Sequence, residues 1–229
     1  MSSRLELEDP YVAKPLYIDV GEYRANFSLE GVPRVKTFVE RPGEMAELES
    51  ALLPQRQNMR QKIFVLYGLG GIGKTQLAVE FTRRHHRKFS SVFWLDGSSE
   101  VSLKLSIARC AGRIPASQIS DASRTYSMSS VGNIDEVVRE VMGWLAQPDN
   151  IEWLVVFDNV DRDYSPHTAD LLAYDVRQYF SGVDHGSVLI TTRLAQLEQL
   201  GGSQQVNKVD RAQAQAILES WYKKELGKF

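Results

Sequence analysis

Residues 63–75 read I-F-V-L-Y-G-L-G-G-I-G-K-T, and the expected fold follows from this stretch. The segment Gly68–Thr75 matches the phosphate-binding pattern G-x-x-x-x-G-K-[ST] at every fixed position. The apolar run Ile63–Tyr67 predicts a buried strand before the loop, and apolar residues at helical spacing in Gln76–His86 predict a helix after it. A strand, a glycine-rich loop and a helix in this order are the structural context that the pattern requires.

The residue types in this loop suit phosphate chemistry. Glycines lack Cβ atoms, so the chain can curl tightly and direct successive backbone N–H groups at phosphate oxygens. The start of the following helix adds further N–H donors and a positive dipole end. Lys74 is expected to reach the β- and γ-phosphates, and Thr75 to offer its hydroxyl to Mg²⁺. The alternative is a glycine-rich turn that matches by chance, which should happen about once in a hundred chains of this length.

Composition indicates a soluble globular protein. The 229 residues are 43% hydrophobic and 24% charged, which suits one large α/β domain with an extra arm. The chain has 27 Lys and Arg residues and 29 Asp and Glu residues, and this near balance gives no electrostatic case for nucleic acid or a membrane as a partner.

The basic run Arg83–Lys88 is interpreted as a solvated helix end, since cations complement the helix dipole there. With Cys110 as its one cysteine and no apolar signal region, the chain is expected to be cytoplasmic.

Strand and helix patterns alternate along the chain. Strands are expected at Ile63–Tyr67, Ser91–Leu95, Glu152–Asp158, Gly186–Arg193 and Val206–Val209. Helices are expected from Pro42 until Pro54 ends the first, then at Gln76–His86, Glu100–Gly112, Ile134–Leu145, Ala169–Phe180 and after a cap at Asp210. The Ser-rich segment Ile114–Asn133 is expected to be a loop and the segment most prone to disorder. This alternation predicts an α/β fold with a parallel sheet of about five strands, helices on both faces and ligands at the carboxyl ends of the strands.

A second candidate site element is E-W-L-V-V-F-D-N-V-D, residues 152–161. An apolar strand that ends abruptly in Asp158 has the form of the Walker B element, whose carboxylate emerges beside the nucleotide and holds Mg²⁺. Many strands end in Asp, but one that does so about 85 residues after a phosphate loop is a stronger signal. We therefore predict a magnesium site formed by Thr75 and Asp158.

Six segments in this order resemble the NB-ARC family of STAND-type P-loop NTPases, the nucleotide-binding switch of plant resistance proteins, an apoptosome scaffold and fungal NLR-like receptors. They are F-V-E-R at Phe38, G-L-G-G-I-G-K-T at Gly68, V-F-W-L-D at Val92, L-V-V-F-D-N-V-D at Leu154, G-S-V-L-I-T-T-R at Gly186 and a strand–helix ending at Val206–Trp221. The resemblance implies a three-layer P-loop NTPase domain over residues 37–229, with residues 1–36 as an N-terminal arm or linker.

The resemblance also implies roles for single residues. Val39 and Arg41 would contact the adenine side of the nucleotide, and Arg193 would act as a sensor beside the γ-phosphate. A guanidinium at a strand end can pair bidentately with phosphate on chemical grounds, although a surface ion pair is the alternative. The catalytic residues would be Lys74, Asp158, Asn159 and Arg193. The nucleotide-binding residues would be Val39, Arg41, Gly68, Gly70, Gly71, Ile72, Gly73, Lys74, Thr75 and Gln76.

Two features depart from the family pattern. Many members carry a second acid directly after the Walker B Asp, where this chain has Asn159. An amide can orient water but cannot accept its proton, so we expect slow hydrolysis. The helical ARC and winged-helix modules that clamp ADP in the family are absent from the sequence. We therefore interpret the chain as a fragment that is monomeric, whereas a full-length protein could oligomerise on activation.

The implied function is an ATP/ADP-binding switch with Mg²⁺ as cofactor, acting in signal transduction, innate immunity or programmed cell death. The strongest alternative is a GTPase, because Asn207–Asp210 spells the guanine-recognition motif N-K-x-D. Against it, the approach G-G-S-Q-Q-V is weakly apolar and the expected D-x-x-G is missing. Val206 and Val209 are instead interpreted as core positions of a short strand. A small-molecule kinase, an AAA+ motor and a nucleotide-binding scaffold without turnover are further alternatives.

Overall fold

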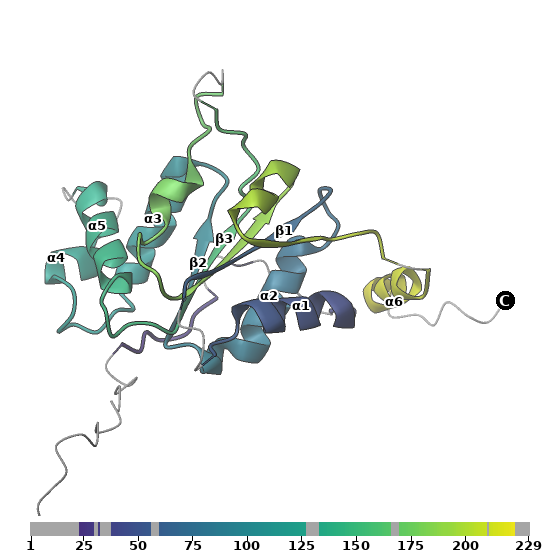
Figure 1. Ribbon diagram of the computed structural model, residues 1–229, viewed down its shortest axis with the longest axis horizontal. Coiled ribbons are helices and arrows are strands. Elements are labelled where there is room, and N and C mark those ends of the chain that lie inside the picture. The colour runs from purple at the N-terminus through teal and green to yellow at the C-terminus, as the bar shows by residue number, and fades with distance from the viewer. Residues whose placement is uncertain are drawn as a thin grey trace, which may run out of the picture.

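A parallel sheet forms the centre of the molecule. The computed structural model describes residues 23–29, 32, 38–55, 60–126, 133–165, 170–209 and 211–222. Within these residues, five parallel strands pair in the order β2-β3-β4-β1-β5 (Figure 1). They are β1 (Lys62–Tyr67), β2 (Ser91–Asp96), β3 (Trp153–Asp158), β4 (Ser187–Thr192) and β5 (Gly202–Gln205). The predicted α/β fold with a parallel sheet of about five strands is confirmed.

Helices alternate with the strands, and several of them begin at a residue that favours a helix start. The α-helices are α1 (Pro42–Leu52), α2 (Lys74–His85), α3 (Glu100–Ala111), α4 (Asp121–Arg124), α5 (Ile134–Leu145) and α6 (Arg211–Tyr222). Three short 3₁₀ segments are η1 (His86–Lys88), η2 (Val176–Tyr179) and η3 (Ala195–Leu200). Pro42 opens α1, where its missing N–H costs no hydrogen bond. The side chain of Asn133 accepts from the Asp135 N–H at the start of α5.

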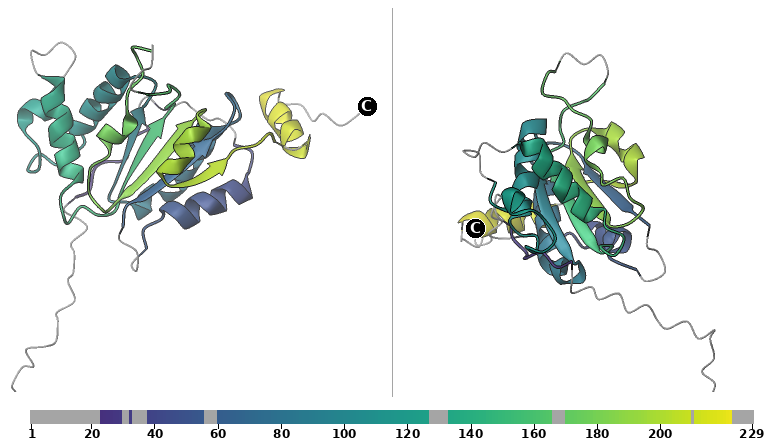
Figure 2. Two further views of the ribbon diagram at one scale, coloured as in Figure 1. Left: turned by 45° about the horizontal axis from the view of Figure 1, so that its top comes forward. Right: turned by 90° about the vertical axis from the view of Figure 1, so that its left-hand side faces the viewer.

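Both faces of the sheet are covered, which makes three layers (Figure 2). Successive side chains of a strand point to opposite faces. Thus Phe64 and Leu66 pack with α1 and α2, whereas Val65 packs with α3 and α5. All six residues of β3 are buried, as are all six of β4. This double burial explains why the strands are continuous apolar runs rather than alternating patterns.

The strand order determines which loops meet. Strand β4 lies between β1 and β3, with Tyr67 paired to Thr192 and Phe157 to Ile190. Because the strands are parallel, the loops after β1, β3 and β4 emerge side by side at the carboxyl edge of the sheet. The phosphate loop, the segment after Asp158 and Arg193 are therefore neighbours.

Two sequence-based element assignments are wrong. The expected helix Ala169–Phe180 is reduced to η2, because the described part of this segment, residues 170–180, is otherwise turns and irregular chain. The expected strand Val206–Val209 is displaced: the strand is Gly202–Gln205, and Val206 follows it with its N–H donating to Tyr67 O at 2.8 Å. Strand β5 is a mostly exposed edge strand with polar side chains, so its pairing with β1 leaves no hydrophobic pattern in the sequence.

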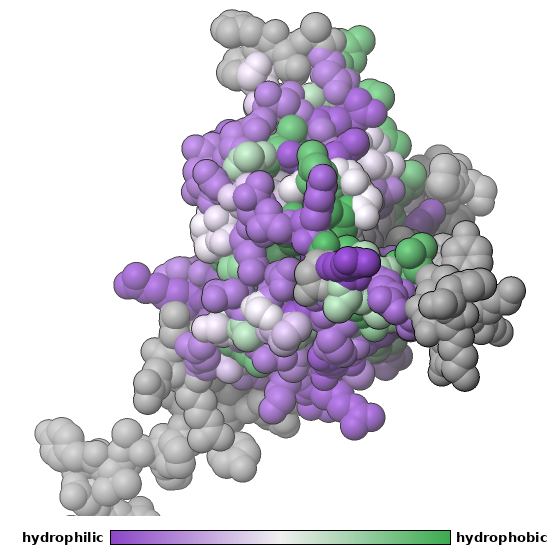
Figure 3. Space-filling view, turned by 90° about the vertical axis from the view of Figure 1, so that its right-hand side faces the viewer, coloured by the Kyte–Doolittle hydropathy of each residue, from purple (hydrophilic) through white to green (hydrophobic). Residues whose placement is uncertain are grey.

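Three segments lie outside the sheet: the described part of the N-terminal arm, the segment around α4, and α6. Of the expected arm, residues 23–29 are described; there Ala25 N–H donates to Ser90 O at 3.3 Å, and Phe27 stacks on His86 with ring centroids 4.2 Å apart. The expected loop Ile114–Asn133 contains α4, and its residues 127–132 lie outside the described chain. Helix α6 lies beyond the β5 edge of the sheet (Figure 1), and the side of the molecule that carries it is mostly hydrophilic (Figure 3).

The start of β4 depends on a glycine. Gly186 has φ +82°, and a Cβ there would lie 2.2 Å from the ring of buried Trp153. That ring is held in place because its Nε1–H donates to Leu145 O at 2.8 Å. Gly186 therefore allows β4 to begin close against β3 and to carry Thr191 and Arg193 to the site edge.

We expect Gly186→Ala to lower the free energy of unfolding by about 3 kcal/mol, because it combines backbone strain with a clash in the core. Gly182→Ala is the matched control: its φ is +67°, but a Cβ there meets nothing within 4 Å. That variant should cost only about 1 kcal/mol. Urea denaturation of both variants measures the difference, and equal losses would contradict the predicted clash.

Candidate nucleotide-binding site

The phosphate loop connects β1 to α2 through glycines in left-handed conformations. The φ angles are +145° at Gly68, +74° at Gly71 and +100° at Gly73. A Cβ on Gly68 would lie 2.7 Å from Val206 O, so this position also needs a residue without a side chain. Helix α2 begins directly after the loop, and its free N–H groups and positive dipole end face the place where phosphates are expected.

Lys74 closes the inner side of this loop. Its Nζ donates to Gly68 O and Leu69 O, at 2.9 Å in both cases, and the residue is 8% exposed. Burial lowers the pKa of Lys74, while the nearby carboxylates of Asp161 and Asp158 oppose that shift. The ammonium is thus fixed beside the loop by carbonyl oxygens that phosphate oxygens can replace.

Asp158 links the loop to the neighbouring strands. Its Oδ1 accepts hydrogen bonds from Thr75 Oγ1 at 2.8 Å and from Thr191 Oγ1 at 2.5 Å. The residue is 3% exposed, and this burial raises the pKa of Asp158 even though both hydroxyl hydrogen bonds favour the charged form. The two residues predicted to bind magnesium, Thr75 and Asp158, are therefore in direct contact.

Thr191 is a site residue that the sequence analysis missed. Besides donating to Asp158, its Oγ1 accepts from the backbone N–H of Asn159 at 3.0 Å. Asn159 has φ +64°, a left-handed conformation that Asn tolerates better than most residues, and its Nδ2 donates to Asp158 Oδ2 at 3.3 Å. The signal available in the sequence was the polar pair that ends an otherwise apolar strand at Thr191 and Thr192.

Arg193 lies at the loop but has a protein partner. Its backbone N–H and its Nε both donate to Asp161, at 2.6 Å each. A Cβ on Gly70 would lie 3.6 Å from Arg193 Cδ and 3.8 Å from Nη1, so the guanidinium lies next to the phosphate loop. The predicted sensor is thus near the expected phosphates, paired to a carboxylate that the sequence analysis did not single out.

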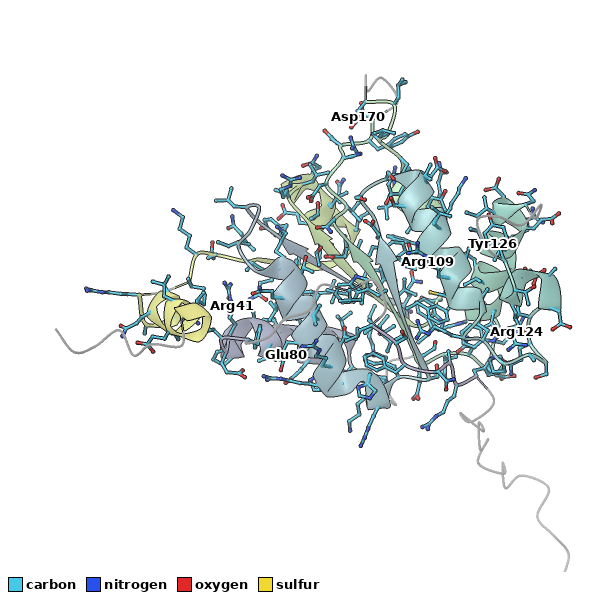
Figure 4. All side chains as sticks on the ribbon, turned by 180° about the vertical axis from the view of Figure 1, so that it is seen from behind. Arg41, Glu80, Arg109, Arg124, Tyr126 and Asp170 are labelled. Carbon is cyan, nitrogen blue, oxygen red and sulfur yellow. The ribbon has the colours of Figure 1, made fainter. Side chains whose placement is uncertain are left out.

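Arg41 joins three segments beside the loop. Its Nη2 donates to Ile72 O at 2.8 Å, and its Nη1 donates to Asn207 O at 3.3 Å. Figure 4 shows Arg41 between α1 and α6, and the residue is 7% exposed.

The other predicted residues near the loop differ in burial. Val39 is half-buried, and Gln76 is exposed in the first turn of α2. Of the N-K-x-D segment, Val206 before it is buried, Val209 is half-buried, and Asp210 lies outside the described residues.

The chemistry of these donors fits a magnesium–phosphate complex. The described residues contain no group of three or more His, Cys, Asp or Glu side chains that could enclose a metal ion. Mg²⁺ does not need such a cage, since it prefers hard oxygen ligands and takes most of them from water and substrate phosphates. A hydroxyl from Thr75 and a carboxylate from Asp158 supply the one or two protein oxygens that such a site requires.

This arrangement defines a P-loop nucleotide-binding domain. Residues 43–221 match the profile of the NB-ARC domain. Because the match covers more than half of the 229 residues, the chain belongs to the NB-ARC family of P-loop NTPases, which are nucleotide-binding domains. A comparison with curated proteins finds no match.

Solved structures share the fold. Cdc6p from Pyrobaculum aerophilum has a TM-score of 0.53 at 14% identity, over 84% of this chain and 51% of that one. The ORC1 protein of Aeropyrum pernix, solved in complex with DNA, has a TM-score of 0.53 at 21% identity over the same shares. The STAND protein PH0952 from Pyrococcus horikoshii, with a tetratricopeptide-repeat sensor, has a TM-score of 0.46 at 18% identity, over 87% and 28%.

The likeness to Cdc6p and ORC1, at these low identities, is a likeness of fold alone. The chain spans about half the length of these two structures and less of PH0952. In the described part of the chain, every helix is too short or too polar to cross a membrane.

We expect Asp158→Asn to stabilise the nucleotide-free protein. Burial raises the pKa of Asp158 above its usual 3.8, so the wild type loses stability as the pH rises from the unfolded pKa through the folded pKa. The amide carries no charge and its oxygen can still accept both hydroxyl hydrogen bonds, and the variant loses only the 3.3 Å hydrogen bond from Asn159 Nδ2. Thermal denaturation should give the variant a Tm a few degrees higher at about pH 7, and the gap should shrink at about pH 4.

Asp175→Asn is the control with the opposite sign. A hydrogen bond from the Arg177 guanidinium lowers the pKa of Asp175, so its charge stabilises the fold at neutral pH. This variant should have a lower Tm at about pH 7. If Asp158→Asn also lowered the Tm, burial would not be the dominant effect at that carboxylate.

Proposed function

We propose that this chain is the ATP/ADP-binding molecular switch domain of an NLR-like STAND signalling protein, with slow Mg²⁺-dependent ATP hydrolysis. The observation that carries this proposal is the 2.8 Å hydrogen bond between Thr75 Oγ1 and Asp158 Oδ1. It brings the two oxygen donors that a magnesium–nucleotide complex needs to one point beside the phosphate loop. The remaining roles follow from what surrounds that point.

The chain's own groups divide the work of binding. Backbone N–H groups of Gly68–Thr75 bind the phosphate oxygens, and Lys74 exchanges its contacts to Gly68 O and Leu69 O for the β- and γ-phosphates. Thr75 and Asp158 would hold Mg²⁺, which would supply positive charge to neutralise that of the phosphates. Thr191 holds Asp158 and the backbone of Asn159 in place while this happens.

Adenine rather than guanine is the proposed base. Val39 and Arg41 are the residues proposed to face the adenine, and Arg41 contacts both the loop and the β5–α6 connection. The backbone carbonyl of Asn207 accepts a hydrogen bond from Arg41. If Asn207–Asp210 recognised guanine, this segment would have to bind the base and Arg41 at the same time. Two alternative functions are tested by the experiments below: a GTPase, and a nucleotide-binding scaffold without turnover.

Slow turnover follows from Asn159. Its amide nitrogen donates to Asp158 Oδ2, and an amide cannot take a proton from an attacking water. We propose that the residues around the loop mainly bind and orient, which suits a switch that stays in one nucleotide state for long periods. Roles in innate immunity or programmed cell death, a cytoplasmic location and the domain limits 37–229 belong to the same proposal.

The proposed partner is an adenine nucleotide. The DNA in the ORC1 structure is a property of that protein, and a likeness of fold at 21% identity transfers no partner. The basic residues at the end of α2 are engaged within the chain: Arg84 pairs with Glu40 and Glu80, and His85 contacts Glu49. These pairings support the interpretation of the basic run as a helix end.

We expect Lys74→Ala to weaken binding of ATP by about tenfold or more, because a charge-assisted contact to the phosphates is lost. Fluorescent-nucleotide titration with Mg²⁺ measures it. Lys88→Ala, which replaces an exposed lysine after α2, is the matched control and should bind as the wild type does.

In a competition experiment with the wild type, ADP should displace the fluorescent nucleotide at lower concentration than GDP. GDP binding as tight as ADP would support the GTPase alternative.

We expect phosphate release slower than about 1 s⁻¹ from the wild type and at least about tenfold faster release from Asn159→Asp, which adds a proton acceptor. Asp tolerates the left-handed backbone at this position as Asn does. Asn159→Gly is the control, because it keeps the backbone conformation and adds no carboxylate. A wild-type rate in the ordinary enzyme range would mean that this domain is a catalyst rather than a slow switch.

A further inference from the structure

Asp161 is the group at the site edge for which the proposed function has no role. It follows β3 by three positions and reaches across to the end of β4, where its Oδ1 accepts the backbone N–H of Arg193 and its Oδ2 accepts Arg193 Nε, both at 2.6 Å. The Asp161 side chain is 18% exposed and that of Arg193 is 60% exposed. The carboxylate is therefore held by the fold, while most of the guanidinium faces solvent.

The Asp161–Arg193 pair lies beside the phosphate loop. Arg193 Cδ and Nη1 are within van der Waals reach of a Cβ placed on Gly70, in the middle of the phosphate loop. Asp161 is therefore bonded to a guanidinium that lies next to the loop expected to hold the phosphates.

We propose that Asp161 is a specificity-determining residue that competes with the γ-phosphate for the Arg193 guanidinium and thereby lowers the preference of the site for ATP over ADP. The proposal rests on the proposed adenine-nucleotide function and adds the group that tunes it. With ADP bound, Arg193 keeps Asp161 as its partner. With ATP bound, Nε leaves the carboxylate or shares it, and the lost ion pair subtracts from the affinity gained at the γ-phosphate.

The size of the effect suits a switch. Ion pairs in which one partner is largely exposed are weak, and breaking one changes an equilibrium by a factor of about two to five. A buried pair would hold Arg193 too firmly for a phosphate to displace it. The backbone hydrogen bond from Arg193 N–H to Asp161 persists when the side chain turns away, so the carboxylate stays in position to recapture the guanidinium.

A second Asp–Arg pair provides a close structural control. Asp175 Oδ1 accepts both the backbone N–H and Nε of Arg177, and Oδ2 accepts Nη2, at 2.7–3.0 Å. The side-chain exposures are 17% for Asp175 and 61% for Arg177, nearly those of the first pair. This pair caps η2, so its removal tests whether loss of a similar ion pair alters nucleotide preference.

The experiment measures Kd for ADP and for the non-hydrolysable triphosphate AMP-PNP, both with Mg²⁺, by calorimetry on five proteins: the wild type, Asp161→Asn, Asp175→Asn, Arg193→Ala and the double variant Asp161→Asn/Arg193→Ala. We expect Asp161→Asn to shift the Kd ratio towards AMP-PNP by about fivefold, with Asp175→Asn within about twofold of the wild type. In the Arg193→Ala background the Asp161 substitution should shift the ratio by less than about twofold, because its partner is gone.

Three results would overturn the proposal. An unchanged ratio in Asp161→Asn shows that the pair does not compete with the γ-phosphate. An equal shift with and without Arg193 assigns the effect to direct repulsion between Asp161 and phosphate. Failure of the wild type to bind either nucleotide removes the proposed function as well, and this outcome is distinct because the first two require a wild type that binds both.

Discussion

The hydrogen bond between Thr75 and Asp158 joins residues 83 positions apart, and the site depends on it. It can form only because β4 separates β1 from β3, so that the loop after β1 and the end of β3 face each other across one strand. The start of α2 supplies the hydroxyl, and the last residue of β3 supplies the carboxylate. One polar contact therefore fixes both the orientation of the phosphate loop and the position of the candidate metal ligand.

Holding a carboxylate at that point works against stability. Asp158 is buried, and two hydroxyl donors offset only part of the cost of keeping its charge away from water. A cation bound there would supply the missing compensation, so nucleotide with Mg²⁺ should stabilise the fold by mass action. Such binding would offset the cost of burying the Asp158 charge.

Two arginines lie next to the phosphate loop. Arg41 is buried and hydrogen-bonded to the loop and to the β5–α6 connection, so it ties these two segments together. Arg193 is mostly exposed and paired to Asp161, so it can change partners without disturbing the core. Both side chains are guanidinium groups that pair strongly with phosphate. Their different burial makes Arg41 a structural residue and leaves Arg193 able to change its partner.

The sequence by itself determined the phosphate loop, the strand that ends at Asp158, the alternation of strands and helices and the family resemblance, because each is a local pattern of glycines, caps or apolar periodicity. Tertiary structure alone decided the rest. The polar edge strand β5 is defined by backbone pairing with β1, and the expected helix Ala169–Phe180 shrinks to η2. Thr191 and Asp161 became site residues through contacts to groups 33 and 32 positions away, which no local pattern encodes.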